Sequence, residues 1–175
     1  MDLTNKNPIK TTSFTIQSLK IEKASQDDSQ KLESFEIPET QVCISIFSNI
    51  VNVTITQTSK IGNIIEAYSE NIDDLTNDDK IYEVRTLFGQ RDIDLYELIA
   101  RSIIDLFYNK ERIFEFMVKQ LQLERPDPYT FVSPFYGKQL ILNISLLNIK
   151  NQQIHQDIFN HIMKNFQFSF MEFML

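Results

Sequence analysis

The segment from Pro38 to Gly62 most constrains the fold, because it holds two runs of alternating apolar and polar residues joined by a short polar turn. Alternation with a period of two is typical of β-strands that bury one face. The segment therefore predicts a β-hairpin. The apolar face of the first arm would carry Val42, Ile44 and Ile46, and that of the second arm Val51, Val53 and Ile55.

Further strands are expected on both sides of this hairpin. Leu32 to Ile37 is a short strand ended by Pro38, and residues 83–88 form another. The last strand alternates Leu140, Leu142, Ile144 and Leu146. Residues 13–22 are also strand-like, but their alternation slips at Gln17-Ser18, so that a bulged edge strand and a loosely docked arm fit equally well.

Three helices are predicted from apolar residues at the helical period. The first runs from Asp92 to Tyr108, with Asp92 as its cap and Asp94 in the electropositive first turn. Its stripe is so apolar that the helix is either buried within the domain or shared with another subunit. The second covers residues 110–124 and ends at Arg125-Pro126. The third covers residues 152–166, and its His155 and His161 are expected on the surface because their spacing does not fit a metal pair.

Two aromatic segments leave alternatives open. Phe131, Phe135 and Tyr136 either cover the sheet or form a binding rim. The tail from Phe166 to Leu175 begins with strand-like alternation and is very apolar, so it should not remain in water. We favour a strand added to the sheet over strand addition to a partner.

Composition bounds the class of protein. A chain of 175 residues with 42% apolar residues fits one ordered domain that can bury a sizeable core. No apolar run is long enough for a membrane span, and residues 1–8 lack the core of a signal peptide. The presence of a single cysteine, Cys43, favours a reducing compartment. We expect the cytoplasm, and the nucleus as a further location. The net charge of −7 argues against binding of nucleic acid.

The sequence offers little chemistry. Its three glycines form no phosphate-binding loop, so no nucleotide cofactor is expected. Cys43 lies in a predicted strand and is read as a small structural hydrophobe. We therefore predict no enzyme, no catalytic residue, no cofactor and no metal.

An acidic run from Glu66 to Lys80 holds six carboxylates against one lysine. Such a run is usually a solvated loop, and it lacks the alternating ligands of an EF-hand. The sharper interpretation is a loop that steers association with a basic partner. Its candidate partner-binding residues are Glu70, Asp73, Asp74, Asp78 and Asp79.

Three segments in order resemble the proteasome assembly chaperone 3 family. The first is Pro38-x-Thr40-Gln41-Val42, with Cys43 near the start of its strand and Lys60-Ile61-Gly62 after the hairpin. The second is residues 83–90, which end in a Gly-Gln corner before the first long helix, and the third is the last strand with its closing helix. The resemblance spans most of residues 32–168 and implies pairing with a related small chaperone of similar fold, contact with proteasome α-subunits during assembly of the α-ring, and no use of ATP.

The expected fold is a single α+β domain with a mostly antiparallel sheet of about six strands covered by two or three helices. Residues 1–31 would be a polar extension with a candidate edge strand. Residues 32–175 would form the chaperone-like domain, in which 110–138 is an insertion. The predicted function is a proteasome assembly chaperone that binds neither nucleic acid nor membranes. The alternative is a trafficking or signalling adaptor of longin or profilin type.

Overall fold

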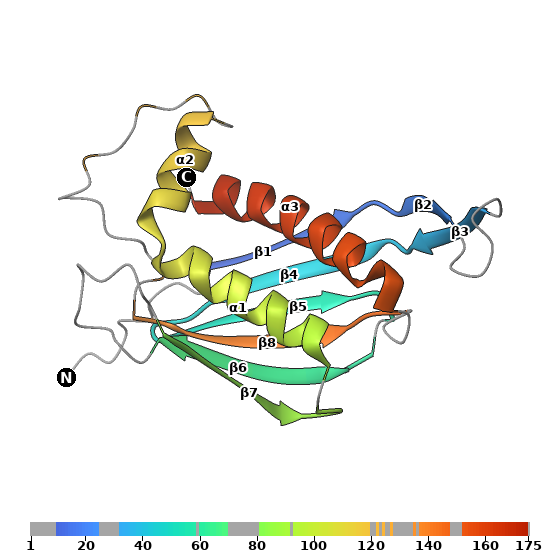
Figure 1. Cartoon of the computed structure of the whole chain (residues 1–175). Coiled ribbons are helices and arrows are strands. Elements are labelled where there is room, and N and C mark those ends of the chain that lie inside the picture. The colour runs from blue at the N-terminus through green and yellow to red at the C-terminus, as the bar shows by residue number, and fades with distance from the viewer. Residues whose placement is uncertain are drawn as a thin grey trace.

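The computed structural model describes residues 10–24, 32–58, 60–69, 81–91, 93–119, 122, 124, 127, 135, 137–147 and 152–174. Its centre is a six-stranded sheet in the order β1-β4-β5-β8-β6-β7 (Figure 1). The strands are β1 (Lys10–Ile16), β4 (Thr40–Ile46), β5 (Ile50–Thr56), β6 (Asn63–Ser69), β7 (Tyr82–Phe88) and β8 (Gln139–Ser145). All neighbours are antiparallel except β5 and β8, which are parallel.

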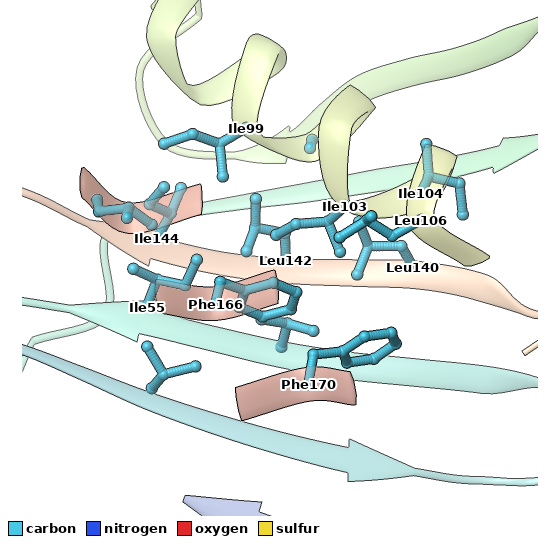
Figure 2. Close-up of a cluster of buried hydrophobic side chains, with 14 of the residues drawn as sticks. Ile55, Ile99, Ile103, Ile104, Leu106, Leu140, Leu142, Ile144, Phe166 and Phe170 are labelled. Carbon is cyan, nitrogen blue, oxygen red and sulfur yellow. The ribbon is translucent and has the colours of Figure 1, made fainter. Parts of the chain in front are cut away.

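Helices cover one face of this sheet (Figure 1). They are α1 (Asp94–Tyr108), α2 (Lys110–Lys119) and α3 (His155–Met174), and the short 3-10 helix η1 (Gln152–Ile154) leads into α3. Ile103 of α1 lies against Leu142 of β8, and Phe166 and Phe170 of α3 lie over β5, while Ile99 and Ile104 of α1 belong to the same core (Figure 2). The predicted α+β class, with a mostly antiparallel sheet and helices on it, is therefore confirmed.

The predicted hairpin is β4 and β5. Its register pairs Val42 with Ile55, Ile44 with Val53 and Ile46 with Val51, so that the two apolar sets share one face. Five of these six side chains are buried and Ile46 is half-buried. The apolar set of β8 is buried beside them, as its alternation predicted: Leu140, Leu142 and Ile144, followed by Leu146.

The slip at Gln17-Ser18 marks the boundary between two strands. β1 is an edge strand of the main sheet, whereas β2 (Leu19–Ala24) pairs with β3 (Leu32–Ile37) in a separate two-stranded sheet. A two-stranded ribbon alone is only marginally stable. This one is held by Ile21 and Phe35, which pack on the core, and by an ion pair between Lys23 and Asp157 of α3.

The start of the acidic run is a strand, which corrects the loop predicted from Glu66. Residues 66–69 belong to β6, where Asn63, Ile65, Ala67 and Ser69 are buried alternately. This alternation is easily overlooked because its buried set contains only two clearly apolar residues. The sheet neighbours β8 and β7 determine the strand, and the charge of Glu66 is accommodated on the opposite face.

The tail is helical, which corrects the predicted strand. α3 continues to Met174, and Phe166 and Phe170 are buried at the helical spacing of four residues, with Met171 buried next to Phe170. The strand interpretation rested on phenylalanine at every second residue, but the middle one, Phe168, is exposed. The ring centroid of Phe170 lies 5.6 Å from that of Phe107 and 4.7 Å from that of Phe135, so that the tail completes the core.

Helix boundaries differ from the prediction at two places. α1 begins at Asp94, whose carboxylate lies in the first turn as expected, but its N-cap position is Ile93 rather than the predicted Asp92, and no side chain of that residue caps the helix; Asp92 itself lies outside the described residues. α2 ends at Lys119 rather than at residue 124, since Gln122 has a φ of 54°, a left-handed conformation that a helix cannot continue through. Phe135 covers the core, which favours the first alternative for its segment, while Phe131 and Tyr136 are outside the described residues.

Candidate partner-binding surface

The two faces of the main sheet carry different side chains. The face under α1 and α3 is apolar, and no helix of the described chain lies on the opposite face, which we call the open face (Figure 1). Because side chains alternate along each strand, the open face receives the residues between the buried ones. Across β1, β4, β5 and β8 these are Thr11, Ser13, Thr15, Gln41, Cys43, Ser45, Ile50, Asn52, Thr54, Thr56, Gln139, Ile141, Asn143 and Ser145.

None of these fourteen open-face side chains is charged. Several are hydrogen-bonded to one another across strands. The amide of Asn143 donates to Asn52 at 3.1 Å, Thr11 donates to Ser45 at 3.3 Å, and the hydroxyls of Thr58 and Ser145 lie 2.6 Å apart. Across these four strands the open face is therefore uncharged and mostly polar, with Ile50 and Ile141 as its apolar residues, and part of its hydrogen-bonding capacity is already used.

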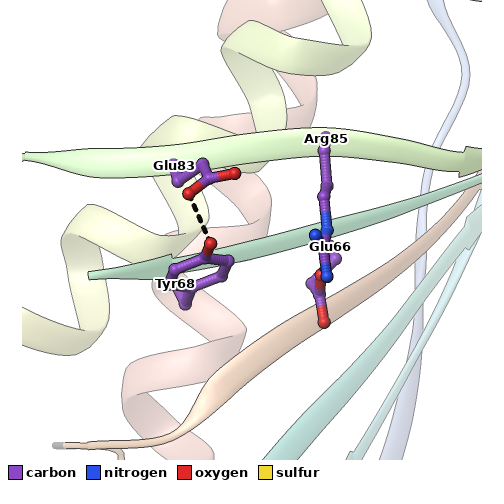
Figure 3. A network of polar contacts seen from close by, with 4 residues as sticks. All are labelled: Glu66, Tyr68, Glu83 and Arg85. Carbon is purple, nitrogen blue, oxygen red and sulfur yellow. Dashed lines mark hydrogen bonds and ion pairs between the residues drawn. The ribbon is translucent and has the colours of Figure 1, made fainter. Parts of the chain in front are cut away.

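Among the strand residues that the structure describes, charge appears on the open face only at β6 and β7. Arg85 Nε lies 2.5 Å from Glu66 Oε2, and Tyr68 donates a hydrogen bond to Glu83 (Figure 3). The hydrogen bond and the attraction from Glu66 raise the pKa of the Arg85 guanidinium above its ordinary value. The side chain of Glu66 is 13% exposed and that of Arg85 is 56% exposed, so the cation of this pair projects farther from the sheet.

Cys43 lies in β4, as predicted, but on the open face and half-buried rather than in the core. It lines a shallow hollow of about 380 Å³ together with Ser13, Thr15, Gln41, Thr54 and Thr56. These neighbours are neutral. The position makes the thiol a natural probe of anything that covers this face.

The α1 helix is built into the domain. Nine of its fifteen residues are buried, and they pack against the sheet and α3. The hydroxyl of Tyr96 accepts a hydrogen bond from the backbone N–H of Leu146 at 3.1 Å. Burial raises the pKa of Tyr96 above its ordinary value, so the side chain stays neutral in this interior. Of the two alternatives left by the sequence, the structure favours core over a seam between subunits.

The five predicted site residues, Glu70, Asp73, Asp74, Asp78 and Asp79, lie outside the described residues. What the structure describes is their frame, because β6 ends at Ser69 and β7 begins at Tyr82 in the neighbouring strand. The role predicted for these carboxylates stays a prediction.

A second hollow of about 380 Å³ lies between the first turns of α1 and α3, where Asp94, Arg101 and His155 meet. Within the part of the chain that the structure describes, no group of histidine, cysteine and carboxylate side chains could hold a metal ion. His155 and His161 are half-buried rather than fully on the surface, and His161 Nε2 lies 2.8 Å from the carbonyl of Gln17. No helix among the described residues is long and apolar enough to cross a membrane.

The prediction from sequence missed the open face. Its signal was present in the hairpin, where the residues between the apolar positions are Gln41, Cys43 and Ser45 in one arm and Asn52, Thr54 and Thr56 in the other. The apolar residues of the hairpin identified the core. Its uncharged residues form a continuous surface only together with those of the neighbouring strands β1 and β8.

Among known proteins, one family of chaperones is similar to part of this chain. The model of the family "Proteasome assembly chaperone 3" matches residues 53–118, from β5 through β6, β7 and α1 into α2. This match confirms the resemblance drawn from the sequence, and the family is one of chaperones rather than enzymes. The matched range ends within the segment 110–138, whose interpretation as an insertion stays a prediction.

Other comparisons add little. No curated protein matches the chain. A solved chain from the crystal structure of a chaperone complex for yeast 20S proteasome assembly is similar at 12% identity, with 84% of this chain and 96% of that chain covered and a TM-score of 0.39. Similarity at this level carries no argument about function.

Proposed function

We propose that this protein is a proteasome assembly chaperone that pairs with a second small chaperone of similar fold and helps to order 20S α-subunits into the α-ring. The match to the proteasome assembly chaperone 3 family over residues 53–118 carries this proposal. It acts without ATP, which agrees with the lack of a phosphate-binding glycine loop in the sequence. Its place of action is the cytoplasm and also the nucleus.

We place the pairing surface on the open face of the sheet. Desolvating a charge is costly unless it is paired, whereas small neutral hydroxyls and amides can exchange water for hydrogen bonds across an interface. The four strands β1, β4, β5 and β8 provide such a surface without one charged side chain. We propose that the partner, a chaperone of similar fold, packs an equally neutral face of its own sheet against this one.

The acidic residues Glu70, Asp73, Asp74, Asp78 and Asp79 act at a different place. In the sequence they lie between β6 and β7, and they carry most of the excess negative charge. We propose that they speed the capture of α-subunits through long-range attraction to basic residues.

The test is co-purification of the tagged chain, followed by light scattering of the complex. We expect a second small chaperone and proteasome α-subunits in the eluate. Asn52→Lys, which puts a charge in the middle of the open face, should abolish pairing, because the new ammonium would have to be buried without a partner. Asn160→Lys, the same change at an exposed position of α3, should leave pairing unchanged.

Two results would contradict the proposal. One is a stable monomer that retains no α-subunit under any condition of co-expression. The other is an eluate dominated by small GTPases or lipid vesicles, which is what an adaptor would give. If Asn52→Lys and Asn160→Lys pair equally well, pairing exists but does not use the open face.

A further inference from the structure

One corner of the open face is apolar. At the end of β6 and β7 farthest from the acidic segment, Leu87 is 53% and Phe88 is 60% exposed. Ile64 is half-buried beside them, and Ile61, just before β6, is 78% exposed. We call Ile64, Leu87 and Phe88 the apolar corner, and Ile61 lies three residues before Ile64 in the chain. A monomeric surface rarely gathers this many large apolar side chains without a binding role.

A β-bulge brings two of these residues onto one position of the sheet. The register pairs Ile65 with Thr86 and Ile64 with Phe88, so that Leu87 is the extra residue. Ile64 is two residues from Glu66 and points to the same face, and its partner Phe88 therefore lies on the open face as well. Bulges at sheet edges commonly redirect side chains and are designed features rather than defects.

The backbone on both sides of the apolar corner is fixed by close packing and hydrogen bonds. Gly62 packs so closely on β8 that a Cβ at this position would fall 2.2 Å from the carbonyl oxygen of Ile144. Gly89, with a φ of +101°, turns the chain directly after Phe88, and the side chain of Asn63 bonds both backbone groups of Gln90. The side chains of the corner are thus presented by fixed backbone, which lowers the entropy cost of binding.

The apolar corner enlarges the surface that is available for pairing. Four strands of seven residues give a projected area of about 450 Å², while all six give about 650 Å², at the usual rise and strand spacing. A stable interface buries about 800 Å² of accessible surface on each partner, and accessible area exceeds projected area. β6 and β7, with the corner on them, add about 200 Å² of projected area to the neutral strands and so enlarge the surface available for pairing.

Charge indicates what the occupant must carry. Arg85 is two residues from Leu87, and Lys60 directly precedes Ile61. Arg85 projects farther from the sheet than Glu66 does, and the side chains of Arg85 and Lys60 are both exposed. A partner surface with an apolar side chain and a nearby carboxylate is complementary to an apolar corner bordered by cations.

We infer that the apolar corner is the anchor of the pairing interface, with Phe88 as its central residue, and that it receives an apolar side chain flanked by a carboxylate on the partner chaperone's sheet. This inference rests on the proposed pairing through the open face. Binding energy in interfaces concentrates in a few residues, with aromatic side chains prominent among them. Phe88 has the size, the exposure and the fixed backbone of such a residue.

The experiment measures the dissociation constant between the full chain and the small chaperone that co-purifies with it. Phe88→Ser should weaken pairing about thirtyfold, the effect of losing an interface hot spot. The matched control is Phe47→Ser, because Phe47 is 41% exposed in the turn between β4 and β5. Melting curves of the two variants should coincide with that of the wild type within a few degrees, since both side chains are exposed.

A second variant tests the charge. Exchanging the ion pair by Glu66→Arg with Arg85→Glu keeps the attraction within the sheet but makes the projecting charge negative. Pairing should weaken about tenfold and should recover partly at high salt, because salt screens the new repulsion.

Alkylation of Cys43 in the complex distinguishes failure of the inference from failure of the proposed function. If the thiol is protected on pairing but Phe88→Ser and Phe47→Ser bind alike, the open face pairs and the anchor role is wrong. If Phe88→Ser pairs normally but loses α-subunits, the corner binds the proteasome instead. Self-association of the chain alone that Phe88→Ser abolishes would make a second copy the occupant, and would overturn the inference in its stated form.

Discussion

The covered and open faces of the sheet come from the same strands and yet have opposite roles. On the covered face, side chains from β4, β5, β8 and two helices form one continuous core (Figure 2). On the open face, one position away along each strand, four strands carry neutral polar groups and two carry the charged pair and the apolar corner. The comparison shows that a strand with a period of two specifies folding with one set of residues and leaves the other set free for recognition.

The largest expected effect lies in the core of the covered face. Phe170→Ala should lower the free energy of unfolding by about 3–5 kcal/mol, because it leaves a cavity between Phe107, Phe135 and Phe166. Phe168→Ala, two residues away on the exposed side of α3, should cost about 1 kcal/mol or less. Urea unfolding measures both. Equal losses would mean that the tail is not packed as a helix on the core.

Tyr96→Phe should give a smaller loss, about 1–3 kcal/mol, since the buried N–H of Leu146 would lose its acceptor. The pH dependence sharpens this prediction. The folded pKa of Tyr96 is raised, so its contribution to stability is full below the ordinary tyrosine value of about 10 and is lost as the pH rises through the folded value. The gap between wild type and variant should therefore narrow above pH 10. A gap that widens there would contradict the direction of the shift.

On the open face, Cys43→Ala should cost on the order of 1 kcal/mol or less, because the side chain is small and half-buried. Pairing should persist. Loss of function with an unchanged melting temperature would instead indicate a reactive thiol. Thermal melting and the pairing assay together decide between these readings.

The smallest effect on stability is expected from the acidic segment. Asp73, Asp74, Asp78 and Asp79 replaced by Asn and Ser should leave the melting temperature nearly unchanged but slow association with α-subunits. The difference in association rate should shrink as salt is raised, since exposed charges are screened beyond about 10 Å at 0.1 M ionic strength. Equal rates at low salt would reduce the segment to a solvated connector.

The sequence predicted those parts of the fold in which one period dominates. β4, β5 and β8 have clear alternation, and α1 has a clear helical stripe, so their buried faces were predicted correctly. β6 was missed in part because its strand is determined by neighbours on both sides rather than by its own apolar residues. The tail was assigned to the wrong element because Phe166 and Phe170 fit both periods, and only their packing with the rest of the core selects the helix.

The candidate surface was harder to predict than the core. A polar residue between two apolar ones looks the same whether it meets water or a partner. What distinguishes the open face is the absence of charge over four adjacent strands, and the order β1-β4-β5-β8 cannot be obtained from local pattern, since β8 comes from a distant part of the chain. The apolar corner depends likewise on a bulge that pairs Ile64 with Phe88.

The most direct measurement of the central claim uses the only cysteine of the chain. Cys43 lies in the hollow of the open face, so its alkylation rate reports whether that face is covered. We expect the rate to fall, when the partner chaperone is added, in proportion to the fraction of the chain that is paired, and to return when Asn52→Lys prevents pairing. A complex in which Cys43 is alkylated as fast as in the free chain would show that the open face is not the pairing surface.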